Sequence, residues 1–168
     1  MRLNLLLAAI LLGETAAAAD APPKPPCENY EWSTAREQAA FAATPTEATS
    51  GATLDALPAG TTRIALKPLS EAGLPTAPEK APKDGAKGAW LILPIAAAGT
   101  YHITLDGRLW VDAVQAGQTT APKAHGGDPS CKLFHKSLRF DLQAGPLTLQ
   151  FSGEGADSVT FTILPAAE

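Results

Sequence analysis

Short runs in which apolar and polar residues alternate constrain the fold of this chain more than any other feature. Residues 98–107 and 144–153 each begin with Ala-Gly and end in a turn that contains glycine. Between these turns every second residue is apolar, as with Tyr101, Ile103 and Leu105 in the first run. Because successive side chains of a strand point to opposite faces of its sheet, this alternation is typical of half-buried antiparallel strands.

Three alternating runs close the chain, and short turns at residues 144–145 and 153–155 join them. We expect one face of these strands to be buried through the apolar residues Leu138, Phe140, Leu142, Leu147, Leu149, Phe151, Val159, Phe161 and Ile163. The opposite face is polar, and we expect it to form a solvated outer surface through Thr148, Gln150, Thr160 and Thr162.

Further strands are predicted upstream, at residues 61–67 and 89–94, with a possible short one at 53–57. An Asp106-Gly107 turn between the runs 100–105 and 108–115 is a strong hairpin signal. About eight short strands with frequent turn signals predict an all-β fold, an antiparallel β-sandwich. The segments 44–52, 68–88 and 116–130 are rich in loop-forming residues, and the long loop 68–88 is where function or disorder would concentrate.

One helix is predicted, over residues 34–43. Thr34 and Glu37 have the spacing of a capping box, which makes Ala35 the first helical residue, and Pro45 follows the end of the helix. A start as early as Glu28 is an alternative that would include two aromatic residues. We expect this helix to pack across a sheet edge or end, held there by Cys27.

The first 19 residues have the pattern of a secretory signal peptide. Arg2 supplies a positive start, the run 5–12 is apolar, and small residues at 17–19 offer a cleavage site. The alternative, a membrane anchor, is disfavoured because a span needs ~20 apolar residues. Residues 20–26 then form a proline-rich spacer, and residues 27–168 form a single domain. The predicted location is therefore periplasmic or secreted, with no membrane span.

Charge and cysteine content restrict the partners and the compartment. A net charge of −4 gives little attraction for nucleic acid, so no nucleic-acid partner is predicted. Cys27 and Cys131 are the two cysteines, and in an exported chain they are expected to form a disulfide that fastens the N-terminal arm to the domain.

A metal site is one candidate for chemistry, because four ligand-type side chains lie within a short stretch: His125, Asp128, Cys131 and His135. The alternative is that Cys131 is consumed by the disulfide and that both histidines are surface residues. His102 is interpreted as an exposed cross-strand partner. No catalytic residue and no cofactor are predicted.

A binding surface is the second candidate. Trp110 and Asp112 share one strand face, and Trp90 belongs to a strand that we expect to be a neighbour. Aromatic rings beside a carboxylate can stack on a sugar or peptide and hydrogen-bond to it. The alternative is that both tryptophans fill the core or lie under the helix.

Two resemblances extend this interpretation. The runs 98–105 and 142–149 look like the terminal strands of bacterial pre-peptidase C-terminal (PPC-like) domains, which are small secreted sandwiches of jelly-roll type, similar to carbohydrate-binding modules. The segments 30–37 and 131–140 resemble small exported proteins of Gram-negative bacteria that are often labelled homogentisate 1,2-dioxygenase. That dioxygenase is a larger cupin-type enzyme whose iron is held by two histidines and a glutamate, and no segment here matches this ligand pattern.

Three classes of function follow. The favoured one is a non-catalytic exported module of the bacterial envelope that binds a small molecule, a glycan or an envelope protein. The second is a small metal-binding protein or enzyme, including one of the dioxygenase type, that uses His125, Cys131 and His135. The third is an inert structural domain.

Overall fold

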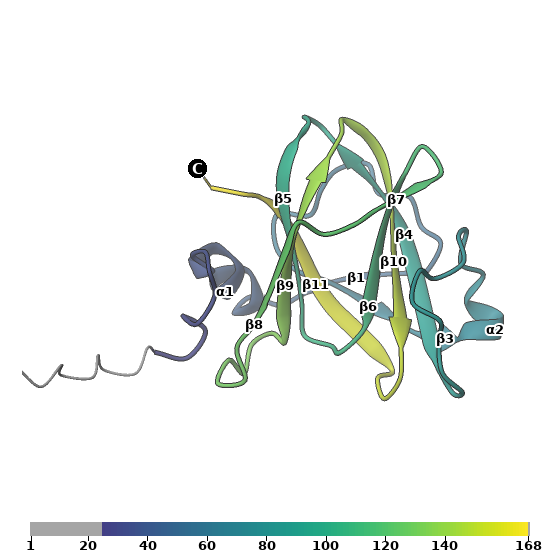
Figure 1. Cartoon of the computed structure of the whole chain (residues 1–168), viewed down its shortest axis with the longest axis horizontal. Coiled ribbons are helices and arrows are strands. Elements are labelled where there is room, and N and C mark those ends of the chain that lie inside the picture. Colours follow the sequence, from purple (N-terminus) through teal and green to yellow (C-terminus); the bar gives the residue numbers. More distant parts are fainter. Residues whose placement is uncertain (1–24, 168) are drawn as a thin grey trace, which may run out of the picture.

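Two β-sheets face one another across a layer of apolar side chains in the computed structural model of this protein (Figure 1). The structure describes residues 25–167. The predicted signal peptide and most of the proline-rich spacer lie outside these residues. The predicted all-β sandwich is confirmed.

The sheets contain six and five strands. In spatial order the six-stranded sheet consists of β1 (Thr46–Ala48), β2 (Thr62–Ala65), β11 (Ser158–Pro165), β5 (Gly99–Leu105), β9 (Lys136–Leu142) and β8 (Ala124–Gly127). The five-stranded sheet consists of β3 (Lys67–Pro68), β4 (Lys87–Ile95), β10 (Gly145–Gly153), β6 (Trp110–Gln115) and β7 (Gln118–Thr120). All pairings between these strands are antiparallel except that of β1 with β2.

The core between the sheets is built from the apolar positions that the alternation predicts. Every predicted inward residue of β9, β10 and β11 is buried, and Ile64, Leu91 and Ile103 join them from other strands. Phe151 and Phe161 meet across the two sheets with ring centroids 4.9 Å apart. This apolar layer is the main source of stability in a sandwich of this kind.

The connections between strands differ from the prediction. Asp106-Gly107 does not turn a hairpin, because β5 belongs to the six-stranded sheet and β6 to the other. The strands β9, β10 and β11 likewise alternate between the sheets. Asp106 instead joins β5 to β11, since its Oδ1 accepts a hydrogen bond of 2.9 Å from the backbone of Thr160. Local turn signals mark where strands end, whereas the demand to bury one apolar face decides which strands pair.

Helix α1 (Ala35–Phe41) lies outside the six-stranded sheet and begins where the sequence predicts (Figure 1). The predicted capping box is wrong, because Thr34 makes no side-chain cap and donates its hydroxyl to the carbonyl of Cys27 at 2.7 Å. The Glu37 carboxylate does not cap the helix either, because it contacts the imidazole of His102. The helix covers a sheet face rather than an edge or end, and Arg36 donates to the carbonyl of Pro165 on β11 at 2.9 Å.

The predicted disulfide is confirmed. Cys27 and Cys131 are bonded, and both are buried beside Tyr30 and Phe134 in a small apolar cluster outside the main core. This cluster and α1 make residues 25–43, here called the N-terminal segment, a cover for the outer face of the six-stranded sheet.

Predicted loops contain some additional structure. The segment 44–52 includes β1, and the segment 68–88 includes the one-turn helix α2 (Leu69–Ala72). Residues 53–57 form no strand, and only Thr53 bridges to Ile92. Neither helix of the described residues is long and apolar enough to cross a membrane.

Candidate binding pocket

Trp110 and Asp112 lie together on the outer face of the five-stranded sheet, as predicted. They are two positions apart on β6, so their side chains share a face. The indole Nε1 of Trp110 donates to Oδ1 of Asp112 at 2.8 Å. Asp112 is 1% exposed, whereas Trp110 is partly exposed. The buried carboxylate therefore fixes the orientation of an accessible ring.

Trp90 shares this outer face but is not adjacent to Trp110. Strand β10 lies between β4 and β6, and Gln150 pairs with Trp90 on one side and with Asp112 on the other. A methyl group on Gly51 would lie 3.5 Å from the Trp90 ring, which places that ring against a different loop. Neither tryptophan belongs to the buried core, so the core-filling alternative is wrong.

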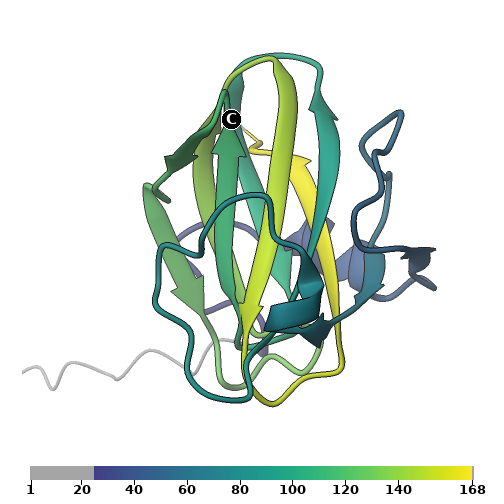
Figure 2. The same cartoon turned by 90° about the vertical axis from the view of Figure 1, so that its right-hand side faces the viewer.

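The segment 73–86, here called the covering loop, runs across this sheet face (Figure 2). Between it and the ends of β6 and β10 lies a pocket of about 540 Å³. The pocket is lined by Lys80, Ala81, Pro82, Lys83, Arg108, Trp110, Ser152, Gly153 and Glu154. Most of these residues are exposed, so the pocket faces solvent.

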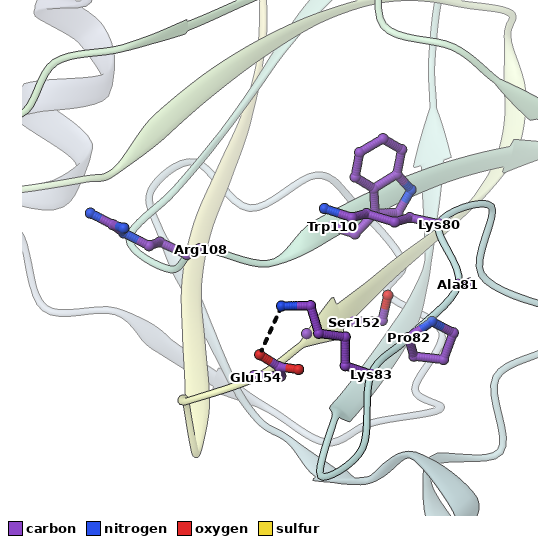
Figure 3. Close-up of a pocket in the computed structure, with 9 residues that line it drawn as sticks. Lys80, Ala81, Pro82, Lys83, Arg108, Trp110, Ser152 and Glu154 are labelled. Atoms are coloured by element: carbon purple, nitrogen blue, oxygen red, sulfur yellow. Dashed lines mark ion pairs between the residues drawn. The ribbon is translucent and has the colours of Figure 1, made fainter.

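One cation lies beside the aromatic ring of this pocket, and two more belong to the pocket lining. The ammonium of Lys80 lies 5.6 Å from the Trp110 ring centroid, and Lys83 forms an ion pair of 3.6 Å with Glu154. Figure 3 shows Lys80 beside the indole, whereas the Arg108 side chain extends away from the other residues drawn. Three lining residues are cationic and one is acidic, so the pocket is positive although the chain carries a net charge of −4.

A fourth cation stands near the pocket. Lys136 donates to the carbonyl of Leu109, one residue before Trp110. Burial lowers the pKa of Lys136, and the positive charge of Lys80 lowers it further. An anion placed here would relieve the repulsion between these two cations.

Asp112 is a carboxylate in an unfavourable environment. Burial raises the pKa of Asp112, whereas the hydrogen bonds from Trp110 and from the backbone of Glu79 lower it. The donor distance from Glu79 N is 3.4 Å. The carboxylate of Asp112 therefore links Trp110 on β6 to Glu79 in the covering loop.

The predicted metal ligands do not come together. Cys131 is bonded to Cys27, and His125 is exposed on β8. Asp128 accepts hydrogen bonds from Ser130 and Asn29, and these hold its pKa at about 2. Burial and the nearby charges of Arg108 and Lys136 lower the pKa of His135. Among residues 25–167 no three His, Cys, Asp or Glu side chains are placed to hold a metal ion.

His102 is buried, and the prediction that it is exposed is wrong. It is 5% exposed beneath the N-terminal segment, with Nδ1 2.9 Å from Oε1 of Glu37. The Trp32 ring lies over it with centroids 5.1 Å apart, and the Arg139 guanidinium lies 5.2 Å from the same Trp32 ring. The segments 30–37 and 131–140 pack against one another, since Tyr30 lies beside Phe134 and Arg139 lies beside Trp32.

Most pocket residues were not predicted as site residues. Lys80 and Lys83 lie in the long loop that the sequence marked only as a region of interest, and Arg108 follows a turn. The clustering of cations on an acidic chain has no signal in composition or spacing. Comparison with known protein families, curated proteins and solved structures gave no match to this chain.

Proposed function

We propose that this protein is a non-catalytic exported binding module whose pocket at Trp110 binds acidic saccharides. The observation that supports this most is a positive pocket around an accessible, fixed indole in a chain whose net charge is −4. Local positive potential attracts anions even when the whole protein repels them. The Cys27–Cys131 bond fits a location outside the reducing cytoplasm.

The lining residues match the chemistry of an acidic sugar. An indole offers a flat apolar surface to the C–H groups of a sugar ring, and lysine ammonium groups bind carboxylate or sulfate through charge-assisted hydrogen bonds. The hydroxyl of Ser152 can donate to or accept from sugar hydroxyls. A volume of about 540 Å³ lies in the range of small-ligand sites. The resemblance to PPC-like domains, which are similar to carbohydrate-binding modules, favours the same ligand class.

The test is binding to an array of acidic glycans, containing uronic acids or sulfate, and of their neutral counterparts. We expect the wild-type protein to bind acidic glycans selectively, with an affinity that falls as salt increases, because the charges are exposed. Trp110→Ala and the double variant Lys80→Ala/Lys83→Ala should each weaken binding by about tenfold or more. Lys67→Ala/Lys132→Ala, which removes two exposed lysines outside the pocket, is the matched control.

Two results would contradict the proposal. One is the absence of any signal on acidic glycans. The other is binding that the pocket variants and the control pair weaken equally, since the attraction would then reflect charge in general rather than this pocket.

A further inference from the structure

The covering loop is attached to the sheet beneath it by two buried polar side chains. Oε1 of Gln150 accepts from the backbone N–H of Thr76 at 2.9 Å, and Nε2 of Gln150 donates to the Thr76 carbonyl at 3.0 Å. Asp112 accepts from the N–H of Glu79 at 3.4 Å. Gln150 and Asp112 are 0% and 1% exposed. The prediction that Gln150 belongs to a solvated outer surface is therefore wrong, because the covering loop lies over it; Thr162, on the other sheet, is also buried, at 1% exposure.

The loop has little else to hold its middle part. Residues 74–82 form no helix or strand, and three prolines remove N–H donors from the segment 73–86. Within the described part of the chain, the backbone hydrogen bonds of residues 74–82 are those to Gln150 and Asp112. At its ends Gly73 and Gly85 have φ of 60° and 79°, a left-handed conformation that glycine adopts readily.

The same loop supplies two of the three cations of the pocket. Lys80 directly follows Glu79, whose N–H is bound by Asp112, and Lys83 lies three residues further on. Asp112 also receives the indole N–H of Trp110, so a single Oδ1 atom joins the aromatic wall to the cationic wall. The distance of 5.6 Å between Lys80 and the Trp110 ring depends on where the loop is held.

We propose that Gln150 is a positioning residue of the pocket, acting through Thr76 to hold Lys80 and Lys83 opposite Trp110. This inference rests on the proposed function for its biological meaning, but its physical content is independent of any glycan. Gln150 itself is not among the residues that line the pocket. Its paired hydrogen bonds hold the loop backbone that carries the cations, so less of the loop has to be ordered when an anion binds.

The variant Gln150→Met tests this role, because methionine preserves side-chain length and loses both hydrogen bonds. Gln115→Met is the matched control. Gln115 makes the same doubled contact to a backbone, with Gln143, at 2.8 Å and 2.9 Å, in a part of the sheet that does not line the pocket. Thermal unfolding establishes that both variants fold.

The first readout needs no ligand. Quenching of Trp110 fluorescence is measured with anionic iodide and with neutral acrylamide, and the Trp110 contribution is obtained by comparison with Trp110→Phe. If Gln150 holds the cations beside the ring, Gln150→Met should lower the ratio of iodide to acrylamide quenching about twofold or more, and Gln115→Met should leave it unchanged. An unchanged ratio in folded Gln150→Met would overturn the inference.

Thr76→Pro keeps the test decisive if Gln150→Met does not fold. This substitution removes the Thr76 N–H donor in the covering loop and changes no residue of β10. Like Gln150→Met, it should lower the ratio of iodide to acrylamide quenching. An unchanged ratio here would also overturn the inference.

The second readout separates the two proposals. The binding free energy for an acidic glycan from the array is measured for Gln150→Met, for Lys80→Ala/Lys83→Ala and for the combined variant. The losses should be non-additive, because both changes act through the same cations. Additive losses would contradict the positioning role. A changed iodide ratio without any glycan binding would leave the positioning role standing and reject the proposed function.

Discussion

Oε1 of Glu37 lies 2.9 Å from Nδ1 of His102, and this contact joins helix α1 to the outer face of the six-stranded sheet. Both residues are buried, with exposed fractions of 2% and 5%. Polar side chains on the outer face of a sheet normally face water, but here the N-terminal segment covers His102. Glu37 therefore holds the helix against the sheet and does not cap its N-terminus.

Removing Glu37 should destabilise the protein strongly. Glu37→Ala leaves the buried Nδ1 of His102 without its hydrogen-bond partner, and we expect the free energy of unfolding to fall by about 2–3 kcal/mol. Glu37→Gln keeps an oxygen acceptor for His102 and should cost only about 1 kcal/mol. Urea unfolding measures both changes. Glu47→Ala, on an exposed position of β1, is the control, and an equal effect there would show that the contact contributes nothing.

Loss of the disulfide should release the N-terminal segment more than the sandwich. The bond between Cys27 and Cys131 closes a loop with a sequence separation of 104 residues. The chain-entropy relation gives such a bond about 4–5 kcal/mol. In the double variant Cys27→Ser/Cys131→Ser we expect the free energy of unfolding, measured with urea, to fall by this amount.

The Trp32 emission of the same variant should shift to longer wavelength as the segment detaches, whereas far-ultraviolet circular dichroism should retain the β signal, because the main core lies between the sheets. Trp32→Phe in the same background identifies the emitting ring. An unshifted Trp32 spectrum would mean that packing alone holds the segment in place.

Asp112 should make the protein less stable at neutral pH than at mildly acidic pH. Burial raises the pKa of Asp112 in the folded state, so the native protein retains a proton that the unfolded chain releases at its ordinary pKa. The full cost of the buried charge applies above the folded pKa and disappears as the pH falls below the unfolded one.

Asp112→Asn removes that charge and keeps an acceptor for Trp110. Its melting temperature should exceed that of the wild type at pH 7, and the difference should shrink toward pH 4. The exposed Asp55, changed to Asn, should show no such trend. A constant difference across this range would contradict the assigned burial effect.

Asp128 should have the opposite pH dependence. Hydrogen bonds from Ser130 and Asn29 lower its pKa to about 2, so its stabilising contribution is complete above the ordinary carboxyl pKa and is lost as the pH falls through the folded value. Asp128→Ala should melt at a lower temperature than the wild type at pH 7, and the two proteins should converge as the pH approaches 2. Equal melting at pH 7 would show that these bonds do not stabilise the fold.

The local patterns in the sequence were sufficient for the long C-terminal strands β9, β10 and β11 and for their buried faces. Alternation depends only on the two-residue period of a strand, so the inward positions of β9, β10 and β11 are correct without knowledge of their partners. The disulfide was predicted from two cysteines in a chain whose first residues have the pattern of a signal peptide, and it is present. The start of α1 at Ala35 is also correct, although the capping box from which it was predicted does not form.

Other features were decided only when distant segments met. The Asp106-Gly107 turn is equally compatible with a hairpin and with a crossing between sheets, and the crossing occurs because β5 pairs with β9 and β11. The exposure of His102 and Gln150 could not be predicted, because each is covered by a segment more than 60 residues away in the sequence, at separations of 65 and 74.

The sequence by itself determined an all-β sandwich with a short N-terminal helix, one disulfide, and a shared face for Trp110 and Asp112. Only the tertiary structure decided which strands pair, what covers the polar faces of the sheets, and that Lys80, Lys83 and Arg108 line one pocket with Trp110. The physical reason is that side-chain periodicity is set within a few residues, whereas burial and electrostatic potential depend on all neighbours in space.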